Sequence, residues 1–198
     1  MYQRWVALTA LAYVVLHHLG LLPGGLGSAP RDTRWADWLD LLVPFVVLAP
    51  AAMALSVAPA SRRAWGVFGL GAVTYATGHG IHLAANSVGN ADPGPTAHLW
   101  DEVVGHEIWY AGVALVVAAL AMTMPGRPRP GWVGYLLALA VGATWASNAV
   151  GGSGTVVAAL VVALAFAVWG WRHRDDLGLT LLVDFAPAAA FLLVATFR

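Results

Sequence analysis

Long apolar runs alternate with short polar turns along the whole chain. Seven such runs occur, each close to the ~20 residues that a helix needs to cross the hydrocarbon core of a bilayer. The turns between them are rich in glycine, proline and arginine. The pattern predicts an all-α integral membrane protein, a seven-transmembrane-helix bundle that forms one polytopic domain. The predicted spans lie near residues 4–22, 38–59, 65–86, 99–124, 132–150, 154–171 and 179–197.

The composition supports this prediction and excludes several classes of protein. Of the 198 residues 60% are hydrophobic and 10% are charged, whereas a soluble domain has about 25% charged residues. A net charge of zero gives no indication of nucleic acid as a partner, so the expected partner is the lipid bilayer. The sequence has no cysteine, which excludes thiolate metal sites, and no lysine, which excludes a Schiff-base retinal site.

The arginines predict how the chain is oriented in the membrane. Cytoplasmic loops of membrane proteins carry an excess of basic residues. Three arginine pairs fall in the second, fourth and sixth loops: Arg62 and Arg63, Arg127 and Arg129, and Arg172 and Arg174. We therefore expect a cytoplasmic N-terminus and an outer C-terminus, in the plasma membrane of a prokaryote.

Most polar residues of the predicted spans fall in the outer half of the bilayer, and only Asp184 stands apart in the inner half. Burying an ionisable group at the centre of a span costs at least ~2.5–3.5 kcal/mol, so such residues usually face the bundle interior and serve function. The outer group comprises His17, His18, Asp40, His79, His82, Asn86, His98, Asp101, Glu102, His106, Glu107, Ser147 and Asn148.

Helical spacing places several of these side chains on shared faces. His79, His82 and Asn86 follow the i, i+3, i+7 spacing of one helical face. In the next span His98 and His106 are eight residues apart, with a glutamate midway between them. Because consecutive spans are usually antiparallel neighbours, the two ladders of polar side chains can face each other.

Imidazole and carboxylate groups at this spacing can bind one metal ion between helices. The preferred ligands are His79, His82 and His106, with Glu102 as a further ligand or general base. Asp101 and His98 would support these ligands or hold a second metal, Asp101 with a catalytic role, and His18 or His17 would complete the site from the first helix. We expect the supporting polar side chains to be Asn86, Asn148, Glu107, Asp40 and His17. A divalent metal is expected, zinc before iron or copper.

This ligand set favours a membrane-embedded, metal-dependent enzyme, a zinc hydrolase that acts on a lipid or amphiphile from the outer leaflet. Seven helices with buried histidines and acids resemble the architecture of the alkaline ceramidase and adiponectin-receptor group of hydrolases. That group places a HxxxH pair on its last helix, whereas the last span here offers only Asp184. The resemblance therefore assigns no catalytic residue.

Two other functions fit the same residues. A redox protein would hold haem, copper or a di-iron centre between histidines of different helices. A transporter or binding module for a proton, metal ion or small polar ligand would also use intramembrane His, Asp and Glu. Structural roles are open as well: acids complement a helix N-terminus, and amides such as Asn86 and Asn148 hold helices together. Trp109 and Trp145 are expected to serve packing.

Overall fold

In the computed structural model, which describes residues 1–19, 22–151 and 154–197, the chain is helical throughout and the described residues contain no strand. Two short 3₁₀ turns, Pro23–Leu26 and Pro30–Asp32, lie in the first long connection. The helices are α1 (Tyr2–Leu16), α2 (Trp35–Asp40), α3 (Val43–Ser56), α4 (Arg62–Ala91), α5 (Pro95–His98), a π-helical segment (Leu99–Gly105), α6 (His106–Ala121), α7 (Trp132–Gly151), α8 (Thr155–Arg172) and α9 (Leu179–Ala195).

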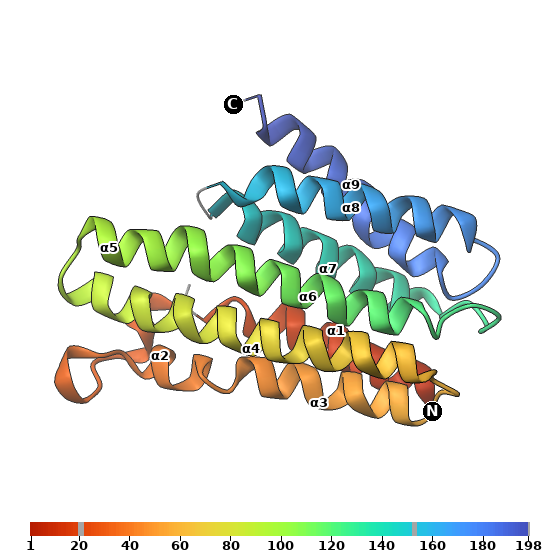
Figure 1. Cartoon of the computed structure of the whole chain (residues 1–198), viewed down its shortest axis with the longest axis horizontal. Helices are drawn as coiled ribbons and strands as arrows, with labels where there is room; N and C mark the ends of the chain where they lie inside the picture. The colour runs from red at the N-terminus through yellow and green to blue at the C-terminus, as the bar shows by residue number, and fades with distance from the viewer. Residues whose placement is uncertain (20–21, 152–153, 198) are drawn as a thin grey trace.

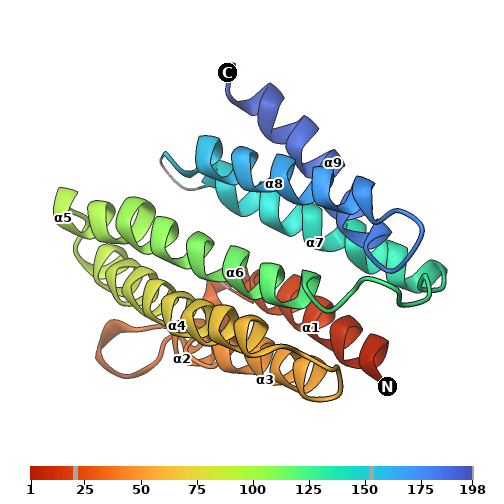
Figure 2. The ribbon, with the colours of Figure 1, turned by 45° about the vertical axis from the view of Figure 1, so that its right-hand side comes forward.

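The helices form two groups that pack side by side (Figures 1 and 2). In the first group α4 lies along α6, and α1 packs on α3. In the second group α9 packs against both α7 and α8. The contact between α1 and α7 joins the two groups, so the middle of the molecule is lined by helices from both.

Four helical stretches are long and apolar enough to cross a membrane: residues 35–56, 95–121, 132–151 and 155–172. Of the others, α9 is apolar but has 17 residues, α1 has 15, and α4 has 30 residues but contains polar side chains such as His79, His82 and Asn86. The all-helical prediction is confirmed, and the four long apolar stretches correspond to the predicted spans 38–59, 99–124, 132–150 and 154–171. The end of the first predicted span, at residues 20 and 21, lies outside the described residues.

The second predicted span, 38–59, is not one straight helix. It is divided into α2 and α3 at Leu41 and Leu42, just before Pro44 at the start of α3. Because Asp40 is the last residue of α2, its backbone carbonyl lacks a helical partner. That carbonyl accepts a hydrogen bond from Nε2 of His79, at 3.0 Å. The break in the helix therefore gives a buried histidine of α4 its partner.

The three loops that carry the arginine pairs, α3–α4, α6–α7 and α8–α9, gather at one end of the molecule, where the N-terminus also lies (Figure 1). Nε2 of Gln3 donates to the carbonyl of Pro128 at 2.6 Å, and Nη2 of Arg129 donates to the carbonyl of Arg174 at 2.8 Å. These bonds tie α1, the α6–α7 loop and the α8–α9 loop together. The connection between α4 and α5 lies at the opposite end.

Candidate metal centre

Close packing of α4 on α6 builds the framework of the site. A Cβ atom at Gly78 of α4 would collide with the backbone nitrogen of Trp109, and one at Gly112 of α6 would collide with the backbone nitrogen of Tyr75. Glycines at such contacts let two helices approach more closely than side chains would allow. As a result the rings of His82 on α4 and of a histidine on α6 come within reach of one another.

The π-helical segment Leu99–Gly105, which directly precedes α6, determines the direction in which the side chains of Asp101 and Glu102 point. In an α-helix, residues five positions apart point roughly 140° away from each other, whereas a π-helical turn pairs them. Here Nδ1 of His106 donates a hydrogen bond to the backbone carbonyl of Asp101, five residues earlier, at 2.8 Å. This bond leaves Nε2 of His106 available as a lone-pair donor, and it places Asp101 beside that ring.

Three side chains offer metal ligands at this point: His82, Asp101 and His106. Their donor atoms all lie within 4.8 Å of one another, and the ring centroids of the two histidines are 4.5 Å apart. Nδ1 of His82 is 2.5 Å from Oδ1 of Asp101. Donor atoms around a tetrahedral zinc, at ~2.1 Å from the ion, lie about 3.4 Å apart. Shifts of about an ångström would therefore close this set around one ion.

Several buried polar atoms at the site have no hydrogen-bond partner among the described residues. They are Nδ1 of His79, Nδ1 of His82, Oδ1 of Asp101 and Oε2 of Glu102. Nδ1 of His82 and Oδ1 of Asp101 nevertheless lie in direct contact as an ion pair. An unsatisfied buried polar group costs ~1–3 kcal/mol, and more when it is charged. A bound cation would be shared by the donor atoms of His82 and Asp101.

His79 lies beside this cluster, where another partner holds it. Its Nε2 is 3.0 Å from the carbonyl of Asp40 and 3.3 Å from Oδ1 of the same residue, and only 3% of the side chain is exposed. Its ring centroid is 6.2 Å from that of His82. The structure therefore brings the predicted ligand His79 and the predicted supporting residue Asp40 together as a pair next to the cluster.

Trp109 packs against four histidine rings, which come from the end of α1, from α4 and from α6. Its ring centroid lies 5.1 Å from His17, 5.6 Å from His79, 5.6 Å from His82 and 5.3 Å from His106. The His17 ring stacks on it with an angle of 14° between the planes. Sequence reasoning assigned Trp109 to packing and missed this contact, although its position one helical turn after His106 places it on the same face.

His17 and His18 both follow the end of α1 and bond their own helix. Nδ1 of His17 bonds the carbonyl of Tyr13 at 2.9 Å, and its Nε2 bonds the hydroxyl of Tyr75 at 2.9 Å. Nδ1 of His18 bonds the carbonyl of Val14 at 2.7 Å. His17 therefore packs with the aromatic rings next to the site. Like His17, His18 is not among the three clustered ligands.

A polar hollow of about 310 Å³ leads from the α4–α5 end of the molecule to the cluster. Its wall includes Asn86, His98, Asp101 and Glu102. His98 is exposed at this hollow, and the Glu102 carboxylate, 28% exposed, lies 3.8 Å from Nδ1 of His106. Small polar molecules therefore have a route to Glu102 and Asp101.

The remaining predicted residues lie around or away from the cluster. Oδ1 of Asn86 accepts hydrogen bonds from Arg34 at 3.1 Å and from Asn90 at 2.6 Å, so this amide ties α4 to the α2 connection. Glu107 is exposed. Asn148 lies on α7, half-buried, and its Nδ2 has no partner among the described residues.

Comparison of the chain with models of protein families, with characterised proteins and with solved structures finds no match.

Proposed function

We propose that this protein is a membrane-embedded, metal-dependent hydrolase, with zinc as the metal. The observation that carries the proposal is the convergence of His82, Asp101 and His106, whose donor atoms lie within 4.8 Å of one another. Two imidazoles and one carboxylate form a common ligand set of catalytic zinc sites, which keep a fourth position open for water. The metal would supply a water of lowered pKa at that position.

Each neighbouring side chain has a role in this proposal. Glu102 lies next to the ligands with its buried Oε2 unpaired, so it is placed to take a proton from the attacking water. The carbonyl of Asp101 fixes His106 through Nδ1, as backbone carbonyls do for metal-binding histidines. The His79 and Asp40 pair packs behind His82 and limits its motion.

The donors limit the choice of metal to zinc, iron or copper, and the neighbouring acid favours zinc. Imidazole nitrogen and carboxylate oxygen suit zinc, and they also suit iron and copper, while Mg²⁺ and Ca²⁺ prefer all-oxygen sites. A carboxylate base beside a three-ligand site is the arrangement used by zinc metalloproteases. Iron or copper in the same ligands would direct the site towards redox chemistry instead.

The membrane setting defines the class of substrate. We propose seven spans, with the arginine-rich end in the cytoplasm under the positive-inside rule, in the plasma membrane of a prokaryote. The cluster then lies towards the outer side, and the polar hollow opens at that end. A lipid or other amphiphile would place its scissile ester or amide there while its apolar part stays in the bilayer.

The test is the metal content of the protein purified in mild detergent, with turnover of amphiphilic esters and amides measured on the same sample. We expect one zinc per chain in the wild type, and loss of at least 90% of it in His82→Ala and in His106→Ala. His173→Ala is the matched control, because this ring packs on Trp169 at the arginine-rich end, 4.2 Å between centroids. Glu102→Gln should keep the metal and lose turnover.

Two results would count against the proposal. Unchanged metal content in both His82→Ala and His106→Ala would exclude the ligand set. Zinc bound by these ligands, with Glu102→Gln as active as the wild type, would exclude Glu102 as the base.

A redox function is the second candidate, and the aromatic side chains favour it. From Trp109 the rings continue to Tyr110 at 5.6 Å and on to Trp145 at 4.5 Å between centroids. Such a chain of rings can carry an electron away from a metal at the histidines. Iron or copper, with visible absorption on the purified protein, would favour this function over hydrolysis. Haem fits least well, because Trp109 fills the space between the four histidine rings.

A further inference from the structure

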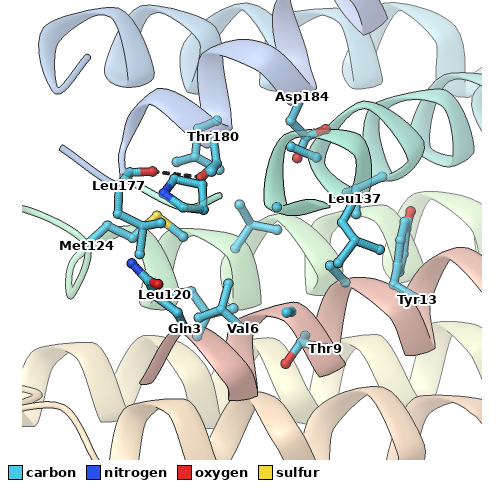
Figure 3. A pocket seen from close by; sticks show the side chains of 18 of the residues that line it. Gln3, Val6, Thr9, Tyr13, Leu120, Met124, Leu137, Leu177, Thr180 and Asp184 are labelled. Carbon is cyan, nitrogen blue, oxygen red and sulfur yellow. Dashed lines mark hydrogen bonds between the residues drawn. The ribbon is translucent and has the colours of Figure 1, made fainter. Parts of the chain in front are cut away.

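An apolar cavity separate from the metal centre lies between the two groups of helices. Its volume is about 320 Å³, within the ~300–1,000 Å³ range of small-molecule pockets. It runs along α1 from Gln3 to Tyr13 (Figure 3), which is about 15 Å at 1.5 Å per residue. The exposed Arg4 and Gly131 lie at one end of the cavity. The cavity therefore opens at the arginine-rich end of the molecule.

Nearly all of the cavity wall is aliphatic or aromatic. The polar exceptions include Gln3, Arg4, Thr9 and Thr180. The aliphatic wall is formed largely by Val6, Ala10, Val113, Val116, Val117, Leu120, Leu137, Val141 and Leu181. A molecule bound here would therefore need an apolar body.

Asp184 is the acid in the wall of the cavity and lies toward the same end as Tyr13, away from Gln3 (Figure 3). Its side chain is buried, with 6% exposed, and Oδ1 has no hydrogen-bond partner among the described residues. The close contact of α9 with Gly142 of α7 fixes its position, because a Cβ there would run into the Asp184 carbonyl. A buried carboxyl oxygen without a partner is costly, so this position favours a ligand with a cationic group that donates a hydrogen bond.

We propose that this cavity is a binding site for a lipophilic amine. The ammonium or amino group would bind the Asp184 carboxyl at the end of the cavity away from Arg4. The alkyl body would lie between α1, α6 and α7 and extend towards Arg4. An acidic amphiphile of the same length would have to bind in the reverse direction, with its head at Arg4, and would leave the Asp184 carboxyl in contact with an alkyl chain. The cation already in the wall, Arg4, lies at the other end of the cavity.

This site does not depend on the proposed hydrolase. Tyr13 lines the cavity. Its ring also packs on that of His17, with 4.3 Å between the centroids. Trp145 also lines the cavity and contacts Tyr110. These rings separate the cavity from the histidines, so substitutions in the cavity should leave the metal content unchanged.

The test uses the full chain in phosphatidylcholine nanodiscs, with tritiated dodecylamine as the probe and empty nanodiscs as the blank. We expect saturable binding at one site per chain in the wild type. Asp184→Asn, which keeps the shape and removes the acid, should weaken binding at least tenfold. Asp175→Asn is the control, since that exposed acid lies in the α8–α9 loop with 92% of its side chain accessible.

A second pair of variants tests the place of binding without touching the acid. Ala10→Trp fills the cavity and should abolish binding, while Leu11→Trp adds the same ring on the outer face of α1, where Leu11 is 47% exposed, and should bind as the wild type does. The proposal is overturned if Asp184→Asn or Ala10→Trp binds with wild-type affinity. It is also overturned if dodecanoate displaces the labelled amine as well as unlabelled dodecylamine does, or if no binding exceeds the blank.

Discussion

Among single residues, Trp109 has the widest influence on the candidate site. Its ring contacts histidines from three segments of the chain, and two of them, His82 and His106, are proposed ligands. It is buried, with 5% exposed. Removing the ring would leave a cavity among these histidines and free both ligands to rotate, so its packing links stability to metal affinity.

We predict that Trp109→Ala destabilises the protein by about 3–5 kcal/mol, the usual cost of emptying a buried tryptophan position. It should also weaken metal binding by about 10–100-fold, as loss of support around ligands does. Trp109→Phe, which keeps a ring, should lose less of both. The measurements are a denaturant titration and competition with a metal chelator.

Trp132→Ala is the control for this substitution, because that tryptophan is 73% exposed at the arginine-rich end. Wild-type metal affinity in Trp109→Ala, together with reduced stability, would show that the ring fills space without positioning the ligands.

The sequence was sufficient to predict which polar residues form the site, but not which of them contact one another. Polarity at one depth predicted His82 and His106 as ligands and Asp101 as a supporting residue, and the structure brings these three together. The pairing of His79 with Asp40 depends on the break between α2 and α3, which helical periodicity within one span does not contain. For that reason His79 was predicted as a ligand of the same rank as His82.

At the scale of helices, the contact between α4 and α6 decides whether the ligands meet. Gly78 and Gly112 lie where each helix backbone touches the other helix. The apolar runs predicted both helices, α4 and α6. They did not predict the π-helical turn at Leu99–Gly105, because its composition does not differ from that of an α-helix. The α-helical spacing predicted a shared face for His98, Glu102 and His106 and left Asp101 in a supporting role, whereas the π-helical turn brings Asp101 next to His106.

We predict that Gly78→Ala separates α4 from α6 and weakens metal binding by more than tenfold. The added Cβ would collide with the Trp109 backbone, and overpacking of this kind costs about 1–3 kcal/mol in stability. Gly80→Ala is the matched control, because that glycine lies two residues away on the same helix, is exposed, and has open space around its Cβ position. Elemental analysis and thermal unfolding of both variants in one detergent provide the measurement.

Equal metal content and equal unfolding temperature in Gly78→Ala and Gly80→Ala would contradict this account. The two helices would then tolerate a wider separation without moving His82 from His106, and the ligand set would not depend on glycine contacts.

For the whole molecule, the main feature is the separation of charge along its long axis. The three loops with arginine pairs, which predict the orientation in the membrane, lie at one end of the molecule. The N-terminus lies beside them (Figure 1). The polar hollow that leads to the candidate metal centre is reached from the α4–α5 connection at the other end. Membrane insertion with the arginines inside would therefore present the hollow to the outer side.

This orientation can be tested directly, because the chain contains no cysteine and any single introduced thiol is the only one. We predict that Ala91→Cys, an exposed position before the α4–α5 connection, reacts with a membrane-impermeant maleimide on intact cells. Asp175→Cys, in the α8–α9 loop with 92% of its native side chain exposed, should react only after the membrane is permeabilised. The reverse pattern would place the hollow in the cytoplasm and require a cytoplasmic substrate. Labelling of both positions on intact cells would mean that the two ends lie on the same side, which contradicts a spanning bundle.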